Sequence, residues 1–290
     1  MIMDTSSTVW EELSGKHIAD WLTNFKGEVW AKKHERLLAL WLLSHFTFYS
    51  SNEVKRLCKV VYNDLIHLVL TKNASSGTPP TELVNDFFSK ASIIPSEAIS
   101  GSGGFIGYLF RHETGLPMNL FNYSVDNVDP QVTNLITIDD VTLSSGQDGQ
   151  MARFLKRKRP LFLGKEVYLL TLVSTQSSVA YLKNTFGVNV VPAIQLDARD
   201  KCFNRQSDIF AAFPELTQPC QTFAEHYGNK IGIGHPLGFR NGQYTFGFYY
   251  NAPDNTLPIF WGQVNGWIPI IKRHHKKYKS RKFLPDERFI

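Results

Sequence analysis

The chain has 290 residues, of which 43% are hydrophobic and 20% charged, so it can bury a sizeable core as one large domain or two smaller ones. It lacks a run of about 18 apolar residues, which argues against a membrane-spanning helix. The formal net charge of +5 is concentrated in residues 272–290, which hold eight Lys or Arg and two Asp or Glu, so the rest of the chain is nearly neutral.

The N-terminal residues and the cysteines favour a cytoplasmic protein. Residues 1–6 lack the basic stretch and the apolar segment of a secretory signal. Cys58, Cys202 and Cys220 are odd in number and widely spaced, so they predict neither a disulfide framework nor a zinc site. We therefore expect reduced thiols in the cytosol.

A helical N-terminal region is predicted over residues 1–72. Trp21 and Phe25 are spaced for one face of a helix, and the segment after them is rich in Leu and Ala. Ser50, with Ser51 as the alternative, is a candidate N-cap for a further long helix. The polar, proline-ended segment that follows is typical of a joint between two regions.

An α/β core is predicted over residues 73–196, because short apolar runs alternate there with helix-compatible segments. The expected strands are residues 92–94, 118–123, 134–138, 167–173 and 188–194, and the expected helices are residues 81–88, 105–113, 147–156 and 177–186. This alternation predicts a mostly parallel sheet flanked by helices. Ligands of such sheets bind outside the carboxyl ends of the strands, which directs attention to the loops after Ile94 and Ile138.

The alternation stops after residue 196. Residues 207–213 and 216–227 are typical of helices, and residues 243–250 of an aromatic strand. We expect residues 197–271 to form a C-terminal cap packed on the core, followed by a basic tail at residues 272–290.

The loop after the third predicted strand carries the strongest chemical signal. Asp139 and Asp140 follow an apolar run directly, and a short run of small and polar residues comes before the next predicted helix: Ser144, Ser145, Gly146 and Gln147. Backbone N–H groups in such a loop, together with a helix N-terminus, bind phosphate, and adjacent carboxylates accept hydrogen bonds from vicinal ribose hydroxyls. This pattern suits a ribose 5-phosphate group. The alternative is an ordinary turn after a strand, where Asp and Ser are common.

A second small-residue loop follows the first predicted strand. It consists of Ser100, Gly101, Ser102, Gly103 and Gly104. Alone it is more typical of a flexible linker, but its place at a strand exit strengthens the case for a ligand loop. Arg111 lies two turns into the helix that follows and is either a phosphate contact or a structural residue.

The segment 135–147 resembles the phosphoribosyl pyrophosphate (PRPP) loop of type I phosphoribosyltransferases. The resemblance implies that Asp139 and Asp140 are catalytic residues that contact the ribose hydroxyls, and that residues 144–147 wrap the 5-phosphate. It also implies a pyrophosphate loop at residues 100–104 and Mg²⁺ bound with PRPP. Ser145 and Gln147 depart from the Gly and Thr that many members have at these positions.

Further motifs extend the resemblance over most of residues 20–262. In chain order they are Trp21 and Phe25, Tyr49 to Val54, Ser100 to Arg111, the Asp139-Asp140 loop, His235 to Phe239, and Asn255 to Trp261. Together they resemble a phosphoribosyltransferase-like effector family of bacterial conflict systems, some members of which accompany retrons. The resemblance implies a role in antiphage defence, as an effector restrained by partner proteins.

Two functions remain open from the sequence. The first is an enzyme that binds PRPP or a nucleotide and acts by glycosyl transfer or nucleotide cleavage. The second is a sensor or scaffold module that binds the same ligand without breaking a bond.

The sequence has two basic clusters, one of which points to a partner. Residues 272–282 suit a nucleic acid, which would be retron DNA or RNA if the chain accompanies a retron, although a solvated chain end explains them equally well. The second cluster, at residues 153–159, is explained by the favourable interaction of positive charge with a helix C-terminus.

Overall fold

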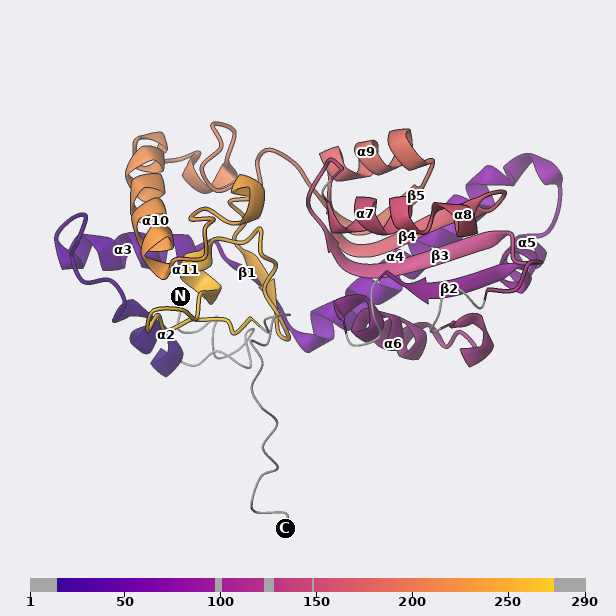
Figure 1. Ribbon diagram of the computed structural model, residues 1–290, viewed down its shortest axis with the longest axis horizontal. Coiled ribbons are helices and arrows are strands. Elements are labelled where there is room, and N and C mark those ends of the chain that lie inside the picture. The colour runs from indigo at the N-terminus through magenta and orange to yellow at the C-terminus, as the bar shows by residue number, and fades with distance from the viewer. Residues whose placement is uncertain (1–14, 97–100, 123–127, 148, 274–290) are drawn as a thin grey trace, which may run out of the picture.

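The computed structural model describes residues 15–96, 101–122, 128–147 and 149–273 of the chain. Two lobes lie side by side along its longest axis (Figure 1). One lobe is built around a parallel sheet with helices on both faces, and the other holds mostly helices and loops. The predicted mixed α/β class is confirmed. Within the described ranges, none of the helices is long and apolar enough to cross a membrane.

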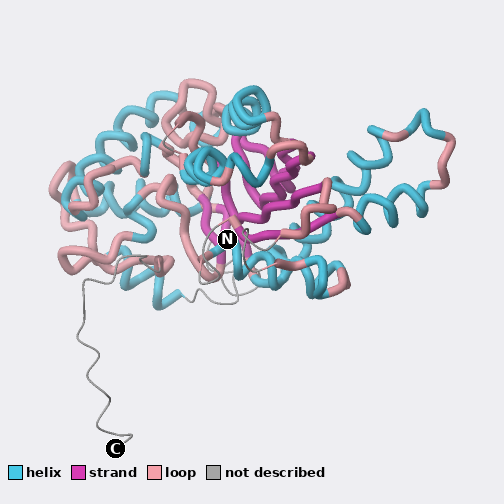
Figure 2. The backbone as a smooth tube through the Cα atoms, turned by 45° about the vertical axis from the view of Figure 1, so that its right-hand side comes forward, coloured by secondary structure: helices cyan, strands magenta, loops and turns pink. Residues whose placement is uncertain are grey.

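The main sheet has the strand order β2-β3-β4-β5, and every neighbouring pair is parallel. The strands are β2 (Ala91–Pro95), β3 (Asn134–Thr142), β4 (Glu166–Thr175) and β5 (Asn189–Leu196). Figure 2 shows them packed together in the middle of the molecule with helices on either side.

The connection between β2 and β3 reverses the direction in which the sheet grows. After β2 the chain passes through α6 (Ser102–Thr114) and places Phe121 in a parallel bridge with Ile93, on the edge of β2 away from β3. It then returns to the opposite edge of β2 and adds β3, β4 and β5 in turn. Such a reversal is a topological switch point, and ligands of open α/β sheets bind at its carboxyl side.

Helices cover both faces of the main sheet (Figure 1). One face carries α7 (Gln150–Arg157), α8 (Arg159–Phe162) and α9 (Gln176–Phe186), and the other carries α4 (Ser51–Lys72), α5 (Pro80–Ser89) and α6. Side chains of β3 alternate accordingly, because Leu135 is buried in the cluster of α7 and α9 whereas Ile136 is buried in that of α4 and α6. The strands are therefore apolar on both sides, as is usual for parallel sheets.

The start of α4 confirms the predicted cap. The Ser50 side chain accepts a hydrogen bond from the Glu53 backbone N–H, and the Glu53 carboxylate accepts one from the Ser50 backbone N–H at 2.7 Å. This reciprocal pair is a capping box, which satisfies two N–H groups that a helix otherwise leaves unpaired. The helix then packs its buried face, including Val54 and Leu65, against the main sheet.

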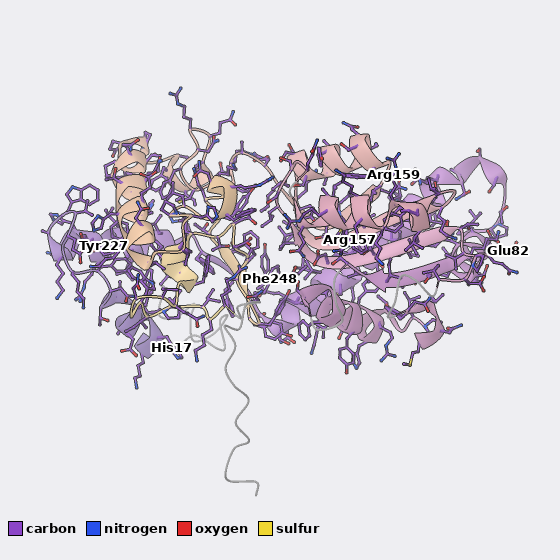
Figure 3. All side chains as sticks on the ribbon, viewed as in Figure 1. His17, Glu82, Arg157, Arg159, Tyr227 and Phe248 are labelled. Carbon is purple, nitrogen blue, oxygen red and sulfur yellow. The ribbon has the colours of Figure 1, made fainter. Side chains whose placement is uncertain are left out.

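The second lobe is made from both ends of the described chain. It contains α2 (Gly15–Leu22), α3 (Lys32–Ser44), α10 (Thr217–Ile231) and α11 (Pro258–Trp261), together with a parallel pair of short strands, β1 (Thr47–Tyr49) and β6 (Phe246–Phe248). Trp21 stacks on Phe260 with ring centroids 5.8 Å apart, and Phe25 contacts Tyr227 edge to face. Phe248 lies where the lobes meet and is buried with residues of the main sheet (Figure 3).

Hydrophobic packing links segments that are distant in the sequence. Buried residues of the segment 15–48 share one hydrophobic cluster with most of those in the segment 202–271, whereas α4 packs in the cluster of the main sheet together with Tyr244, Phe246 and Phe248. The boundaries at residues 72 and 196 stay a prediction about folding units.

Several predicted elements differ in extent from the observed ones. Met118–Leu120 is a 3-10 turn and only Phe121 bridges to the sheet, so the predicted strand at residues 118–123 is reduced to one pair, and residue 123 lies outside the described residues. The helix predicted at residues 207–213 is limited to the short turn Asp208–Phe210, and the strand at residues 243–250 to β6. Conversely, β3 continues through Asp139 and Asp140 to Thr142.

Candidate functional site

A cavity of about 390 Å³ lies at the carboxyl end of β3, between the two lobes. The sheet lobe contributes residues from β3, from the loop after it, from α7 and from the start of α6. The second lobe contributes residues from the segment 239–255 and Arg273. The cavity therefore lies at the switch point between β2 and β3, where the topology predicts a ligand.

Asp139 and Asp140 line this cavity and are 3% and 6% exposed. Asp139 Oδ1 accepts a hydrogen bond from the backbone N–H of Asp140 at 3.0 Å, and Asp140 Oδ1 accepts one from that of Val141 at 2.9 Å. The Tyr250 hydroxyl, from the second lobe, lies 3.5 Å from Asp140 Oδ2 and donates to it. Burial raises the pKa of Tyr250 well above its usual value, and the two carboxylates add to this effect, so Tyr250 remains a donor at neutral pH.

The loop after β3 turns sharply before α7 begins at Gln150. Gly146 has φ +109°, in the left-handed region that favours glycine. A Cβ on Gly149 would lie 2.8 Å from the Ser144 carbonyl oxygen, so this close approach also requires glycine. Ser144 lines the cavity, whereas the side chains of Ser145 and Gln147 are exposed and, like Gly146, are not part of its lining.

The second lobe holds this loop in place. The Arg240 guanidinium donates to the Ser145 carbonyl oxygen at 2.7 Å, and the Asn255 amide lies 3.5 Å from Ser144 Oγ. Arg240 has φ 54° and Gln243 has φ 58°, so non-glycine residues adopt left-handed conformations in the segment that supplies this contact. Such conformations cost about 1–3 kcal/mol each and are concentrated at functional sites.

The predicted pyrophosphate loop reaches the cavity through Ser102, the first residue of α6. Gly103 is buried, and a Cβ there would lie 2.7 Å from Ser96 Oγ, so this glycine lets α6 approach β2 closely. Gly101 and Gly104 do not line the cavity. Ser100 lies outside the described residues.

Arg111 is not part of the cavity lining either. It lies on α6 with its guanidinium carbon 6.0 Å from the centroid of the Tyr108 ring. The structure therefore brings Asp139, Asp140, Ser144 and Ser102 together and leaves Arg111 on a helix surface.

Five further polar residues line the cavity and were not expected from the sequence. They are Gln150, Arg153, Asn251, Asp254 and Arg273. In the sequence, the positive charge of Arg153 is explained by its place near a helix C-terminus. Arg273 belongs to the basic tail, which gives no indication of a ligand site. Asn255, which also lines the cavity, lies in the Asn-Thr-Leu-Pro motif that carries part of the resemblance, so the motif was the one available signal.

Arg273 is the most enclosed cation at the site. Its Nη1 donates to the Ala252 carbonyl oxygen at 2.5 Å, and its guanidinium carbon lies 4.9 Å from the centroid of the Trp261 ring. Its Nη2 lies 3.6 Å from Asp254 Oδ2. Burial lowers the pKa of Arg273, and the charges of Asp254 and Asp140 oppose this effect.

Two buried polar atoms at the cavity lack a hydrogen-bond partner among the described residues. They are Thr142 Oγ1 and Asn251 Oδ1, and both residues line the cavity. Buried polar groups in proteins are nearly always hydrogen-bonded, so two such atoms without partners call for an explanation such as a ligand or ordered water.

Comparison with protein-family models identifies the family of the chain. A family model, PRTase-CE, matches residues 18–273, which include every described residue of the cavity lining. No curated protein and no solved structure shows significant similarity to the chain. Because the family match spans most of its length, the chain belongs to the PRTase-CE family of phosphoribosyltransferase-like effectors.

Proposed function

We propose that the chain binds PRPP or a nucleotide in the cavity between its lobes and acts there by phosphoribosyl transfer or nucleotide cleavage, as an effector of antiphage defence. One observation carries this proposal: Asp139, Asp140, Ser144 and Ser102 line a single cavity at the switch point of the sheet. Family membership and the unpaired atoms of Thr142 and Asn251 support it.

The proposed ligand lies with its ribose over the end of β3. Asp139 and Asp140 accept hydrogen bonds from the two ribose hydroxyls, because ionised carboxylates only accept. The 5-phosphate lies at the loop 144–147, where backbone N–H groups and the N-terminus of α7 favour an anion. The ligand, or water bound with it, then forms hydrogen bonds with the unpaired atoms Thr142 Oγ1 and Asn251 Oδ1.

The proposed chemistry takes place at the ribose carbon that carries the leaving group. The bond from this carbon to the leaving oxygen or base nitrogen breaks, and its electron pair departs with the leaving group. The sugar passes through an oxocarbenium-like state, and an acceptor atom or water then bonds to the same carbon. The carboxylates of Asp139 and Asp140 orient the sugar and stabilise positive charge on it.

Mg²⁺ is compatible with the residues present, as a partner of the ligand and not as a resident ion. Within the described part of the chain there is no group of three or more His, Cys, Asp or Glu that could hold a metal. Mg²⁺ commonly uses one or two carboxylates together with substrate phosphates, and Asp139 and Asp140 supply such oxygens. When bound, it would offset the negative charge of the departing pyrophosphate.

Replacing Asp140 with Asn tests the proposed role of the acids. We expect turnover of PRPP, or toxicity in cells, to fall about 100-fold or more, because one ribose contact and one negative charge are lost. Asp86→Asn is a matched control, since Asp86 is an exposed acid on α5 that pairs with Lys90. Full activity of Asp140→Asn would show that Asp140 does not have the proposed role in binding the ribose and stabilising its charge.

A sensor or scaffold that binds the ligand intact is the second candidate. The exposed side chains of Ser145 and Gln147 favour it, because only Ser144 of the four-residue loop reaches the cavity. Incubating the chain with PRPP and Mg²⁺, or with nucleotides, and analysing the mixture by mass spectrometry separates the two. Consumption of the ligand supports the enzyme, whereas recovery of intact bound ligand supports the sensor.

A further inference from the structure

We infer that Arg273 forms an anion subsite on the second-lobe wall of the cavity, opposite the loop 144–147, and that the ligand carries a diphosphate there. This inference rests on the proposed function, and it narrows the proposed ligands to those that carry a diphosphate. A pentose with a phosphate at one end and a diphosphate at the other fits both walls, whereas a nucleoside monophosphate or ribose 5-phosphate leaves Arg273 without an anion.

The Arg273 side chain is held ready to bind. It is only 16% exposed, its Nη1 is fixed by the Ala252 carbonyl oxygen, and its guanidinium lies over Trp261. Trp261 is itself fixed, because its indole N–H donates to the buried Thr256 carbonyl oxygen at 2.8 Å. A guanidinium already held in one place loses little conformational freedom on binding, and its planar fork matches phosphate oxygens.

The charge of Arg273 is only partly compensated within the protein, although both Asp254 and Asp140 act on it. The Asp254 side chain is 52% exposed, and its Oδ2 lies 3.6 Å from Arg273 Nη2. This separation exceeds the usual length of a charge-assisted hydrogen bond. A buried charge is costly unless it is well paired, and the lowered pKa of Arg273 reflects this cost. An anion bound in the cavity would offset this cost.

Two adjacent residues connect the proposed anion subsites. Asp254 lies next to Arg273, and Asn255 lies next to Ser144 in the loop proposed for the 5-phosphate. The segment Asp254-Asn255 of the second lobe therefore contacts both proposed subsites. Arg153 on α7 also lines the cavity and adds positive charge from the sheet lobe.

Binding of two simple probes to the unaltered chain provides the first test. With Mg²⁺ present, we expect inorganic pyrophosphate and ribose 5-phosphate to bind together, so saturation with one changes the Kd of the other by less than about threefold. Displacement of ribose 5-phosphate by pyrophosphate would overturn the inference, because it would mean a single anion subsite. Failure of pyrophosphate to bind at all would overturn it as well.

Replacing Arg273 with Gln provides the second test. We expect pyrophosphate affinity to fall roughly ten- to a hundredfold, the usual effect of losing a charged hydrogen bond, while ribose 5-phosphate affinity stays within about twofold. Ribose 5-phosphate binding thus reports folding of the variant. Arg199→Gln is the matched control, because Arg199 pairs with Asp197 at 2.8 Å away from the cavity. Unchanged pyrophosphate affinity in folded Arg273→Gln would refute the subsite.

The probes also distinguish failure of this inference from failure of the proposed function. Binding of ribose 5-phosphate without pyrophosphate leaves the proposed function standing and removes the diphosphate subsite. Binding of pyrophosphate that depends on Arg273, without any binding of ribose 5-phosphate, supports the subsite and contradicts the pentose site.

Discussion

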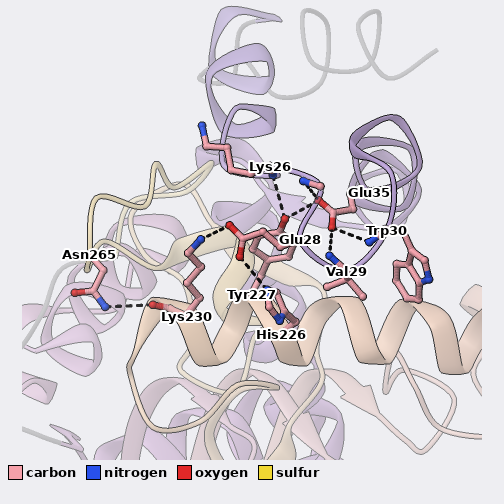
Figure 4. Close-up of polar contacts among 10 residues, drawn as sticks. Lys26, Glu28, Val29, Trp30, Glu35, His226, Tyr227, Lys230 and Asn265 are labelled. Carbon is pink, nitrogen blue, oxygen red and sulfur yellow. Dashed lines mark hydrogen bonds and ion pairs between the residues drawn. The ribbon is translucent and has the colours of Figure 1, made fainter.

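The two lobes each bury carboxylates, and the comparison between them separates structural acids from candidate functional ones. In the second lobe, Glu35 on α3 is fully buried. Figure 4 shows the polar contacts that surround its carboxylate. Its oxygens accept hydrogen bonds from the backbone N–H groups of Gly27 at 2.6 Å and Val29 at 2.7 Å, and from the Tyr227 hydroxyl at 2.6 Å. The protein itself surrounds this carboxylate with donors, so Glu35 ties the turn after α2 to α10.

Asp139 and Asp140 are nearly as buried but lie in a different environment. They line a cavity that also contains unpaired polar atoms of Thr142 and Asn251 and the enclosed cation Arg273. Burial alone therefore does not identify a functional acid. Asp139 and Asp140 are distinguished by the polar cavity beside their carboxylates.

The largest expected effect on stability comes from Glu35→Gln. The amide places an NH₂ group among N–H and O–H donors, so a buried network is broken at its centre. We expect the free energy of unfolding to fall by about 3 kcal/mol, measured by urea denaturation. Ligand affinity should be unchanged under conditions where the variant is folded. A loss under about 0.5 kcal/mol, as is usual for a surface substitution, would mean that Glu35 is not a structural acid.

The same residue predicts a pH dependence. Burial by itself would raise the pKa of Glu35, but hydrogen bonds from Tyr227 and three backbone N–H groups outweigh it and hold the pKa below its ordinary value of 4.5. A carboxyl whose pKa is lower in the folded state stabilises the fold above its unfolded pKa, and this stabilisation is lost as pH falls through the folded value. The difference in unfolding free energy between the wild type and Glu35→Gln should therefore shrink below about pH 4.5. A constant difference from pH 7 to pH 3 would contradict this origin.

Much of the fold could be predicted from the sequence because its signals are local. Ser50 and Glu53 define their cap within one turn, and the apolar runs of β3, β4 and β5 are short and bounded by turn residues. The convergence of the two small-residue loops followed from one general rule about parallel sheets. Only Ser144 and Ser102 of these loops reach the cavity, since which side chain faces inward depends on the path of each turn.

The second wall of the cavity could not be predicted, because it depends on packing between distant segments. Arg273 faces Asp140 only because residues 15–48 and 202–271 fold into one lobe that packs beside the sheet. The extent of β3 was also underestimated. Asp139 and Asp140 are typical of a turn, yet pairing with β4 extends the strand through them, which overrides their local preference.

A smaller effect is expected from Arg240→Ala, which tests whether the second lobe shapes the loop 144–147. Because a peptide is planar, holding the Ser145 carbonyl also fixes the direction of the Gly146 N–H. Losing one hydrogen bond should weaken ribose 5-phosphate binding about fivefold, measured by calorimetry, without lowering stability by more than about 1 kcal/mol. Equal binding by the variant would show that the loop keeps its shape alone.

The smallest effect on small ligands is expected from truncation after Arg273. Removing residues 274–290 takes away six of the eight Lys and Arg of the basic tail but keeps the proposed anion subsite, so pyrophosphate affinity should change by less than about twofold. Affinity for a nucleic acid at low salt should fall sharply, because released counterions no longer contribute. If the truncated chain binds nucleic acid as tightly as the full chain does, another surface is responsible for that binding.

A crystal structure of the chain with PRPP and Mg²⁺ tests the central claim most directly. We expect the ribose hydroxyls within hydrogen-bond distance of Asp139 and Asp140, the 5-phosphate at the loop 144–147 and the diphosphate at Arg273. PRPP bound elsewhere, or a ribose turned away from both aspartates, would contradict the account.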